Sequence, residues 1–468
     1  MSNKNHAPNE KKQALEGEIS FEETREYLSQ LLKRVYSDHD VATDDAIALA
    51  SLATSLDKFL ASSETERQSA LTLKNELSQI ACNSNRSNRE KIKSNSQNRT
   101  ESITEKTFYT NDGRVVYLGT MLGSGGEGAV YKVPNMPGKV VKVFKSTTDF
   151  AYMERKIEAL INNQIPSKLD HVLINTIPES LLYDEDDHFV GYIMPGITTR
   201  FKLYDVSRNS ADRTKYFPEL DYKGLIIIAY NLAEAVSYIH EHEVVIGDLN
   251  PNNIVVNPDG TVCLIDTDSY DIVDKTTNEH FPCAVGLPEM LAPELQNAEY
   301  LKNTCFTRET DLFSLAILIF RLLMNNANPF GGVRSDLVSR AVSDTYTNVE
   351  IMNGESPYIK KIEGLTVPDW APPFSMLPEY IQDLFVRVFD YNQETYLEKI
   401  KERPTTKEWM DALMRFYNEP LNQCEKNHFH WYRKELDQCP LCAKENPPKS
   451  AKKKGIFENL SEIITIGI

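Results

Sequence analysis

The sequence predicts an α+β chain in which a β-rich lobe is followed by a helical lobe. Short β-like runs at 115–118 and 140–144 precede segments with helical spacing of apolar residues from Leu225 onward. A polar stretch separates these lobes from a helical N-terminal module, and cysteines and histidines gather behind them. Strands that are succeeded by a run of helices are typical of an α+β fold.

Shifts in composition divide the chain into six parts. Apolar residues recur at helical spacing within 19–82, whereas 83–106 is rich in Asn and Ser and has few residues to bury. The helices are expected to pack on one another, although residues 20–82 could instead serve self-association or partner binding. The predicted parts are a flexible tail (1–18), a helical module (19–82), a linker (83–106), a two-lobed domain (107–417, with lobes 107–194 and 195–417), a Cys/His module (418–446) and a basic linker with a tail (447–468).

The overall charge argues against nucleic acid as a partner. The chain has 51 Lys and Arg against 68 Asp and Glu, a formal charge of −17, whereas binding to phosphate backbones needs a concentrated basic surface. The longest apolar stretch, 312–324, is too short to span a membrane. The polar start lacks the apolar core of a secretory signal. These features predict a cytoplasmic protein with no membrane span.

A glycine-rich segment at 123–128 has the composition of a phosphate-binding loop. Glycines let the backbone bring N–H groups close to phosphate oxygens. Dinucleotide-binding folds use the same spacing, but there the loop leads into a helix, whereas β-like residues 130–133 follow here. We therefore expect a hairpin over the phosphates, with nucleotide contacts from Gly123, Ser124, Gly125, Gly126, Gly128 and Val130.

Lys142 lies in the next β-like run, where strand alternation separates it from Val141 and Val143. We expect it to face solvent, so that its loss leaves the fold intact. The predicted helix 149–163 carries Glu154 and Glu158 four residues apart on one face. Either carboxylate could form an ion pair with Lys142, and Glu154 is the preferred partner.

Two later segments resemble the core motifs of serine/threonine protein kinases. Residues 246–253 read Ile-Gly-Asp-Leu-Asn-Pro-Asn-Asn, which resembles the catalytic loop H-R-D-L-K-P-x-N. The acid Asp248 and the amide Asn253 keep the family spacing of five residues. Asp266-Thr267-Asp268 stands at the place of D-F-G, directly after the β-like run 262–265.

Further motifs follow in family order. Ala292-Pro293-Glu294 matches A-P-E, and Asp311 matches the acid that begins the central helix of the large lobe. Arg403 resembles the late arginine that often pairs with the A-P-E glutamate. Residues 107–417 therefore look like a protein kinase domain with a bilobal fold.

The resemblance implies transfer of the γ-phosphoryl group of ATP to Ser or Thr of a protein substrate, with autophosphorylation as a further expectation. Asp248 would accept the proton of the attacking hydroxyl, while Asn253 and Asp266 would bind Mg²⁺. Lys142 would contact the α- and β-phosphates. The strand at 189–195 runs into a proline as the interlobe hinge does, so Met194 is expected to bind adenine.

Departures from the family pattern bear on activity. Gly247 replaces the arginine that binds an activation-loop phosphate, which implies activity without that phosphorylation. Asn250 replaces the lysine that offsets charge on the moving phosphoryl group, and Thr267-Asp268 replaces Phe-Gly. A pseudokinase scaffold that binds nucleotide and recruits partners is the alternative. The G-D-L-N-P-x-N form resembles a bacterial branch of these kinases, so catalysis is favoured.

The segment 424–442 offers four ligands for a metal ion. Cys424 and His430 are followed by Cys439 and Cys442, and Cys-Pro-Leu-Cys resembles a zinc-knuckle turn. His428 is a competing third ligand, but His430 is preferred because it precedes Trp-Tyr, like the H-x-Y of kinase-linked zinc ribbons. A redox pair is less favoured because no βαβ pattern surrounds it. We expect a structural Zn²⁺ site, since four protein ligands leave no open position for a substrate.

Overall fold

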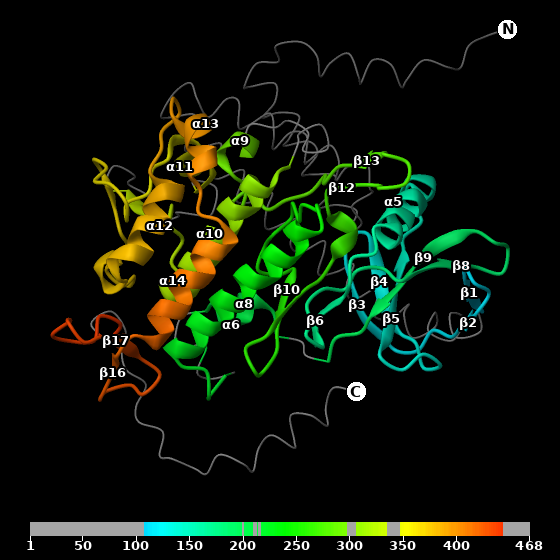
Figure 1. Cartoon of the computed structure of the whole chain (residues 1–468), viewed down its shortest axis with the longest axis horizontal. Helices are drawn as coiled ribbons and strands as arrows, with labels where there is room; N and C mark the ends of the chain where they lie inside the picture. The colour runs from blue at the N-terminus through cyan, green and yellow to red at the C-terminus, as the bar shows by residue number, and fades with distance from the viewer. Residues whose placement is uncertain are drawn as a thin grey trace, which may run out of the picture. The chain divides into compact units, whose positions relative to one another are not determined.

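The computed structural model describes residues 107–198, 201–208, 213, 217–296, 306–334 and 347–442 (Figure 1). The predicted tail (1–18), helical module (19–82), linker (83–106) and C-terminal tail (447–468) lie outside the described residues. The chain divides into two units at Glu105 and Lys106, and every described residue belongs to the second unit.

The first lobe is built on an antiparallel sheet of seven strands in the order β2-β1-β8-β9-β5-β4-β3. Side chains alternate between its faces, so that Val141, Leu182 and Ile193 form a small core on one side. Val140, Phe144 and Tyr192 join the main core on the other side. The strands are β1 (Phe108–Thr110), β2 (Val115–Val116), β3 (Met121–Ser124), β4 (Gly128–Lys132), β5 (Lys139–Phe144), β8 (Ser180–Tyr183) and β9 (Phe189–Pro195).

Helix α5 (Phe150–Asn162) packs against β8 and β9 of this sheet (Figure 1). It begins at Asp149, whose side chain accepts a hydrogen bond from the backbone N of Tyr152 at 3.1 Å. Its buried face consists of Lys156, Ile157, Ala159 and Leu160. A lysine is therefore part of the face that packs inward.

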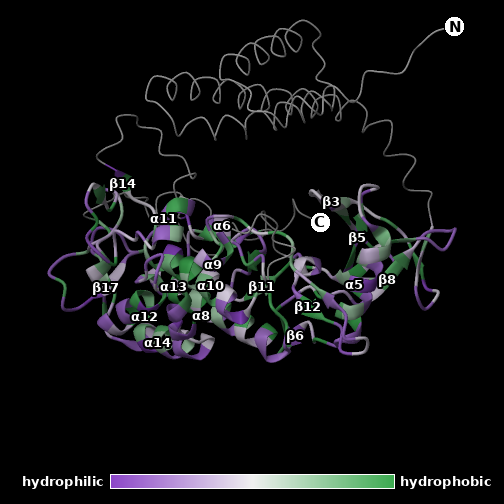
Figure 2. Ribbon diagram, turned by 90° about the horizontal axis from the view of Figure 1, so that it is seen from above, coloured by the Kyte–Doolittle hydropathy of each residue, from purple (hydrophilic) through white to green (hydrophobic). Residues whose placement is uncertain are grey.

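The second lobe is mostly helical and centres on α8 (Tyr222–Glu241) and α10 (Arg308–Leu323). Helix α8 packs on α10 and on α14 (Thr406–Asn418), and α12 (Glu379–Phe389) packs on α10 and α14. Almost every side chain of α10 is buried, whereas α12 and α14 carry both hydrophobic and hydrophilic faces (Figure 2). Aromatic rings fill the space among these helices, including Phe313, Phe320, Phe385 and Phe389. Burial of each such ring contributes about 1.5–3 kcal/mol.

Shorter elements complete the lobe. They are α6 (Leu203–Val206), α9 (Pro293–Gln296), α11 (Thr347–Asn353), α13 (Tyr396–Lys399), the 3₁₀ turns η1 (Thr267–Ser269), η4 (Phe374–Met376) and η5 (Ile400–Glu402), and the paired strands β6 (Lys168–Leu169) with β7 (Val172–Leu173), β10 (Ile254–Val256) with β11 (Val262–Leu264), β12 (Ile272–Val273) with β13 (His280–Phe281), β14 (Val333–Arg334) with β15 (Leu365–Thr366), and β16 (Leu421–Gln423) with β17 (Trp431–Arg433). The predicted α+β class, with a β-rich lobe before a helical lobe, is confirmed. In the part of the chain that the structure describes, no helix combines the length and the apolar character needed to cross a bilayer.

Candidate functional site

The loop that follows α8 carries Asp248 and Asn253. Nδ2 of Asn253 donates to Oδ2 of Asp248 at 2.9 Å and to the Asp248 carbonyl at 3.2 Å. Asn250 is buried and donates to the same carbonyl at 3.3 Å. Burial raises the pKa of the Asp248 carboxyl above its usual value, against the hydrogen bonds from the two amides. Asn250 thus braces the loop but supplies no positive charge.

Asp311, in the first turn of α10, fixes the start of this loop. Its carboxylate accepts hydrogen bonds from the backbone N of Ile246 at 2.8 Å and of Gly247 at 2.9 Å. It also contacts Nε2 of His240 at 2.9 Å. A fully buried carboxylate with three partners is a rigid anchor, so α10 determines where the Asp248 loop sits.

Gly247 is required at its position for two reasons. Its φ is +74°, a region that residues with a Cβ adopt at a cost. A Cβ here would also lie 2.6 Å from Sγ of Cys283. The arginine of the family motif therefore could not be accommodated without displacing the segment that contains Cys283.

The β10–β11 hairpin brings Asp266 beside the Asp248 loop. The backbone N of Ile265, next to the end of β11, donates to the Asn253 carbonyl at 2.9 Å. Asp266 follows with φ +60°, and η1 begins directly after it. The negative charge of Asp266 contributes to the raised pKa of Asp248, so the two carboxylates are electrostatically coupled.

Lys142 on β5 reaches these acids from the other lobe. Its Nζ donates to Oδ2 of Asp268 at 2.6 Å and to Oδ1 of Asp266 at 2.8 Å, and lies 3.6 Å from Oε2 of Glu127. Lys142 is only 6% exposed. Burial disfavours its charge, but attraction from Asp268 and Asp266 raises its pKa above the usual value. The expectation that Lys142 faces solvent was wrong, because the second lobe covers this face of the sheet.

The predicted pair of Lys142 with Glu154 is likewise corrected. Oε1 of Glu154 accepts a hydrogen bond from the Tyr183 hydroxyl at 2.9 Å, and Glu158 is exposed. Among the described residues, neither acid forms an ion pair with Lys142. The physical reason is the rotation of α5, which turns Lys156 inward and the two glutamates toward β8 and solvent.

The glycine-rich segment forms the predicted hairpin between β3 and β4. Three of its glycines, at 123, 125 and 126, have no described atom within 4 Å of the place where a Cβ would lie. Gly128 is different, since a Cβ there would meet the Val143 carbonyl at 2.5 Å. Lys145 supports the loop by donating to the Gly125 carbonyl at 2.6 Å. The hairpin therefore leaves open backbone for a ligand while its base is tightly packed.

The other residues predicted to contact the nucleotide lie on strands β3, β4 and β9. Ser124 ends β3, and Val130 pairs with Lys142 across β4 and β5. Met194 lies near the end of β9, is buried, and pairs with Val140. These residues therefore belong to the same sheet as Lys142.

The segment from Asp266 to Glu294, called the activation segment below, is joined at its end to the C-terminal part of the second lobe. Arg403 donates to Oε1 of Glu294 at 2.6 Å and to Oε2 at 2.8 Å. Arg403 also donates to the Glu309 carbonyl at 2.8 Å and lies over the Phe313 ring at 5.2 Å. The predicted pairing of Arg403 with the A-P-E glutamate is confirmed.

The four predicted metal ligands converge around the β16–β17 hairpin. Sγ of Cys424 lies 3.4 Å from Sγ of Cys442, and Nδ1 of His430 lies 3.4 Å from Sγ of Cys442 and 3.6 Å from Sγ of Cys439. All four ligand atoms lie within 4.8 Å of one another. A tetrahedral ion with bonds of about 2.0–2.3 Å separates its ligands by about 3.5 Å, so the donor set fits Zn²⁺. His428 is exposed and lies outside this group.

The hairpin is attached to the second lobe by polar and apolar contacts. Nε1 of Trp431 donates to Oδ2 of Asp221 at 2.7 Å, and the Phe429 carbonyl accepts from the backbone N of Tyr222 at 2.9 Å. Leu421 and Leu441 belong to the main core. The module is therefore an extension of the second lobe at the N-terminus of α8.

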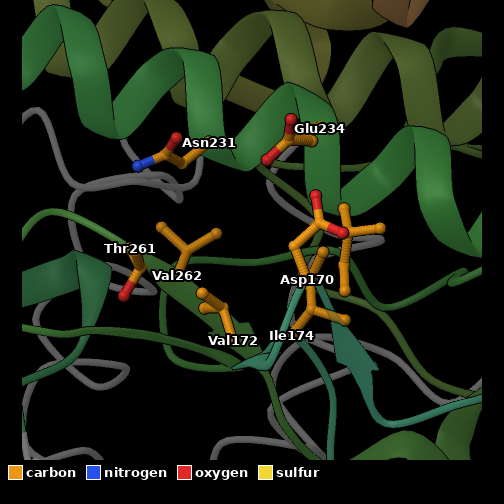
Figure 3. A pocket seen from close by; sticks show the side chains of 8 residues that line it. Asp170, Val172, Ile174, Asn231, Glu234, Thr261 and Val262 are labelled. Carbon is orange, nitrogen blue, oxygen red and sulfur yellow. The ribbon is translucent and has the colours of Figure 1, made fainter.

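A separate pocket lies beside α8 (Figure 3). Asn231 and Glu234 project into it from the helix, opposite side chains of the β6–β7 and β10–β11 regions such as Asp170 and Thr261. None of the predicted catalytic, nucleotide or metal residues lines it. The candidate active site is instead the group of Lys142, Asp248, Asn253 and Asp266.

Two residues of this site were missed by the sequence prediction. Asp268 was recognised only as a departure from D-F-G, and Lys156 was not singled out. The sequence signal for Asp268 is that an acid stands where the family pattern D-F-G has glycine. The signal for Lys156 was its position at helical spacing between apolar residues.

Comparison with known proteins agrees with this geometry. The protein kinase domain family matches residues 117–411, which is more than half of the chain. Protein kinase YegI from Escherichia coli O157:H7 is 31% identical over 343 residues, covering 73% of this chain and 50% of that protein, and YegI from strain K12 is 30% identical over 341 residues, covering 72% and 50%. The Arabidopsis thaliana serine/threonine-protein kinase AtPK1/AtPK6 is 24% identical over 230 residues, covering 48% and 47%.

The α+β fold and the Lys142 site together define a two-lobed kinase domain. The chain belongs to the protein kinase family. It spans about half the length of the YegI proteins that it matches.

Proposed function

We propose that the chain transfers the γ-phosphoryl group of ATP to a Ser or Thr hydroxyl of a protein substrate. The observation that carries this proposal is the meeting of Lys142, Asp248 and Asp266, which come from three separate segments. Lys142 contacts Asp266 at 2.8 Å, and the charge of Asp266 acts on Asp248. Relatives named as serine/threonine-protein kinases support the hydroxyl specificity.

In this mechanism Asp248 orients the attacking hydroxyl and accepts its proton as the oxygen attacks the γ-phosphorus. The bond from that phosphorus to the bridging oxygen of the β-phosphate breaks, and ADP leaves with the bridging oxygen. Asn253 holds the Asp248 carboxylate in place through the 2.9 Å hydrogen bond. Lys142 would bind the α- and β-phosphates, and the glycine-rich hairpin at 123–126 would lie over the nucleotide. The Gly125 N–H would not contribute, because it donates to the Gly128 carbonyl at 2.8 Å. Met194, near the end of β9, would bind adenine.

The oxygen donors of Asp266 and Asn253 fit a Mg²⁺ site, because Mg²⁺ prefers carboxylate and amide oxygens. Nδ2 of Asn253 is directed to Asp248, which leaves its amide oxygen for a cation. Bound Mg²⁺ would supply positive charge that offsets the phosphate oxygens.

We further propose that Cys424, His430, Cys439 and Cys442 bind one structural Zn²⁺. Three sulfur donors and one nitrogen donor at the observed separations support zinc over oxygen-preferring metals. The attachment of the hairpin to α8 by Trp431 supports a stabilising role. Four protein ligands leave no open position for a substrate, so the site would be structural.

The test is incorporation of labelled phosphate from γ-labelled ATP by the wild type and by Asp266→Ala and Asp248→Asn. Both variants should lose Mg²⁺-dependent transfer by a factor of about 10³ or more. Asp383→Asn, an exposed acid on α12, is the matched control and should retain full activity. Transfer that survives in Asp266→Ala would contradict the assignment. A wild type that binds ATP but transfers nothing would favour the pseudokinase scaffold.

A further inference from the structure

We propose that Asp268 is the residue that positions Lys142 for the nucleotide phosphates, in place of a glutamate from α5. This inference rests on the proposed kinase function and adds a positioning residue to the same site. Asp268 lies in η1, two residues after Asp266, the acid that would bind Mg²⁺. It is therefore contributed by the activation segment and not by the helix of the small lobe.

Lys142 donates hydrogen bonds to two acids, Asp268 and Asp266, and a third, Glu127, lies 3.6 Å away with its side chain 56% exposed. The two hydrogen-bonded acids differ in exposure. The side chain of Asp268 is fully buried, whereas that of Asp266 is 45% exposed. The distance from Nζ of Lys142 is also shorter to Asp268, at 2.6 Å against 2.8 Å. Asp266 is needed for the cation during transfer, so Asp268 is the acid that stays available to Lys142.

Because both side chains are buried, Lys142 and Asp268 each need the opposite charge of the other. The Asp268 side chain is fully buried, and its Oδ2 lies 2.6 Å from Nζ of Lys142, a residue that is itself 6% exposed. A buried carboxylate without a cation is costly, as is a buried ammonium without an anion. The pair therefore fixes the position of Lys142 more firmly than an exposed ion pair would.

Helix α5 cannot supply the anion in this arrangement. Its inward position is occupied by Lys156, which is 4% exposed and adds to the attraction on Asp268. Burial lowers the pKa of Lys156. Glu154 is bound to the Tyr183 hydroxyl instead. The buried face of the helix thus offers Lys142 a lysine and no acid.

Contacts with the activation segment, and not an ion pair with Lys142, hold α5 in place. Asn163, at the end of the helix, donates to the Val273 carbonyl at 2.9 Å and accepts from the backbone N of Lys275 at 3.0 Å. Tyr152 packs on Phe281 with ring centroids 5.6 Å apart, and Arg155 pairs with Glu279 at 3.3 Å. We infer that Lys142 keeps its position without an ion pair to α5.

The experiment compares Asp268→Asn with Glu154→Gln, each of which replaces an acid by its amide. Asp268→Asn should raise the KM for ATP and lower kcat, reducing kcat/KM by about 30-fold or more. Glu154→Gln should change kcat/KM less than about 3-fold. Asp383→Asn is the control for loss of an exposed acid. Thermal unfolding of each variant shows whether it is folded.

A double-mutant cycle separates positioning from general destabilisation. Lys142→Met and Asp268→Asn should be strongly non-additive in the affinity for a fluorescent ATP analogue, because the double variant lacks both members of the pair. Additive losses, or a larger loss in Glu154→Gln than in Asp268→Asn, would overturn the proposal. Analogue affinity is measured without phosphoryl transfer. A wild type that binds the analogue but is inactive would therefore contradict the kinase proposal and leave the cycle interpretable.

Discussion

Asp248 combines a buried carboxyl with a donor amide from Asn253. Since burial raises its pKa, Asp248 is protonated at a higher pH than an exposed aspartic acid, whose pKa is about 3.9. In the proposed mechanism, only the ionised form can accept the proton of the substrate hydroxyl. The electrostatics of the loop would therefore bear directly on the rate of transfer.

The pH dependence of the reaction follows from this shift. We predict that kcat falls as the pH is lowered through the raised pKa of Asp248, and that it reaches a plateau above that pKa. A pH–rate profile from about pH 4 to 8 measures the acid limb. The limb should vanish in Asp248→Asn, whose residual activity should not depend on this carboxyl. An acid limb that is unchanged in the variant would assign the titration to another group.

Gly247 gives a test of backbone conformation at one residue. Gly247→Ala should destabilise the domain by more than the roughly 1–3 kcal/mol of φ strain, because the added Cβ also meets Cys283 at 2.6 Å. Gly260→Ala is the matched control, since Gly260 has φ +84° but its Cβ would lie 3.6 Å from the nearest atom, in Ile227. Urea unfolding measures both. Equal losses of unfolding free energy in the two variants would show that the structure shifts at no cost to relieve the contact between the added Cβ and Cys283.

At the scale of elements, the β16–β17 hairpin and the start of α8 form one unit. Asp221 uses one oxygen to cap α8, accepting from the backbone N of Gly224 at 2.9 Å, and the other to accept from Trp431 at 2.7 Å. Helix α8 leads at its other end to the Asp248 loop. Loss of the hairpin should therefore affect the stability of the second lobe.

Removal of the metal ligands tests this unit. Cys439→Ser and His430→Ala should each release the Zn²⁺, disorder residues 421–442 and lower Tm, because Cys424, Cys439 and Leu441 belong to the main core. The affinity for ATP below the unfolding temperature should change less than about 2-fold. His428→Ala is the control and should keep its metal, since His428 is exposed. Elemental analysis measures zinc, and a full content in His430→Ala would change the ligand set.

At the scale of the whole molecule, the Glu294–Arg403 pair joins segments 109 residues apart. Their side chains are 14% and 3% exposed. The hydrogen bonds from Nη1 to Oε1 and from Nη2 to Oε2 together form one bidentate contact between a guanidinium and a carboxylate, which is a strong geometry. The pair connects the end of the activation segment to the region before α14, so it contributes to the cooperativity of the second lobe.

We predict that Arg403→Ala lowers the free energy of unfolding by about 3–5 kcal/mol, because Glu294, whose side chain is only 14% exposed, is left without a cation. The double variant Arg403→Met with Glu294→Gln should lose less than the single variant, since no unpaired charge remains. Lys407→Ala removes a mostly exposed pair with Asp411 and should cost about 0–1 kcal/mol. Chemical unfolding measures all three, and a loss below about 1 kcal/mol in Arg403→Ala would contradict the prediction.

The sequence by itself determined the features that depend on short segments. The glycine hairpin, the spacing of Asp248 and Asn253, and the four Cys/His ligands each lie within a few tens of residues, where local chain geometry limits the arrangements. The α+β class followed from the change of periodicity from strands to helices. Only the tertiary structure decided which acid meets Lys142, because the candidates are 124 and 126 residues away in the chain. The rotation of α5, set by packing against the sheet and the activation segment, turned Lys156 inward and Glu154 toward Tyr183, and spacing along the chain does not encode that rotation.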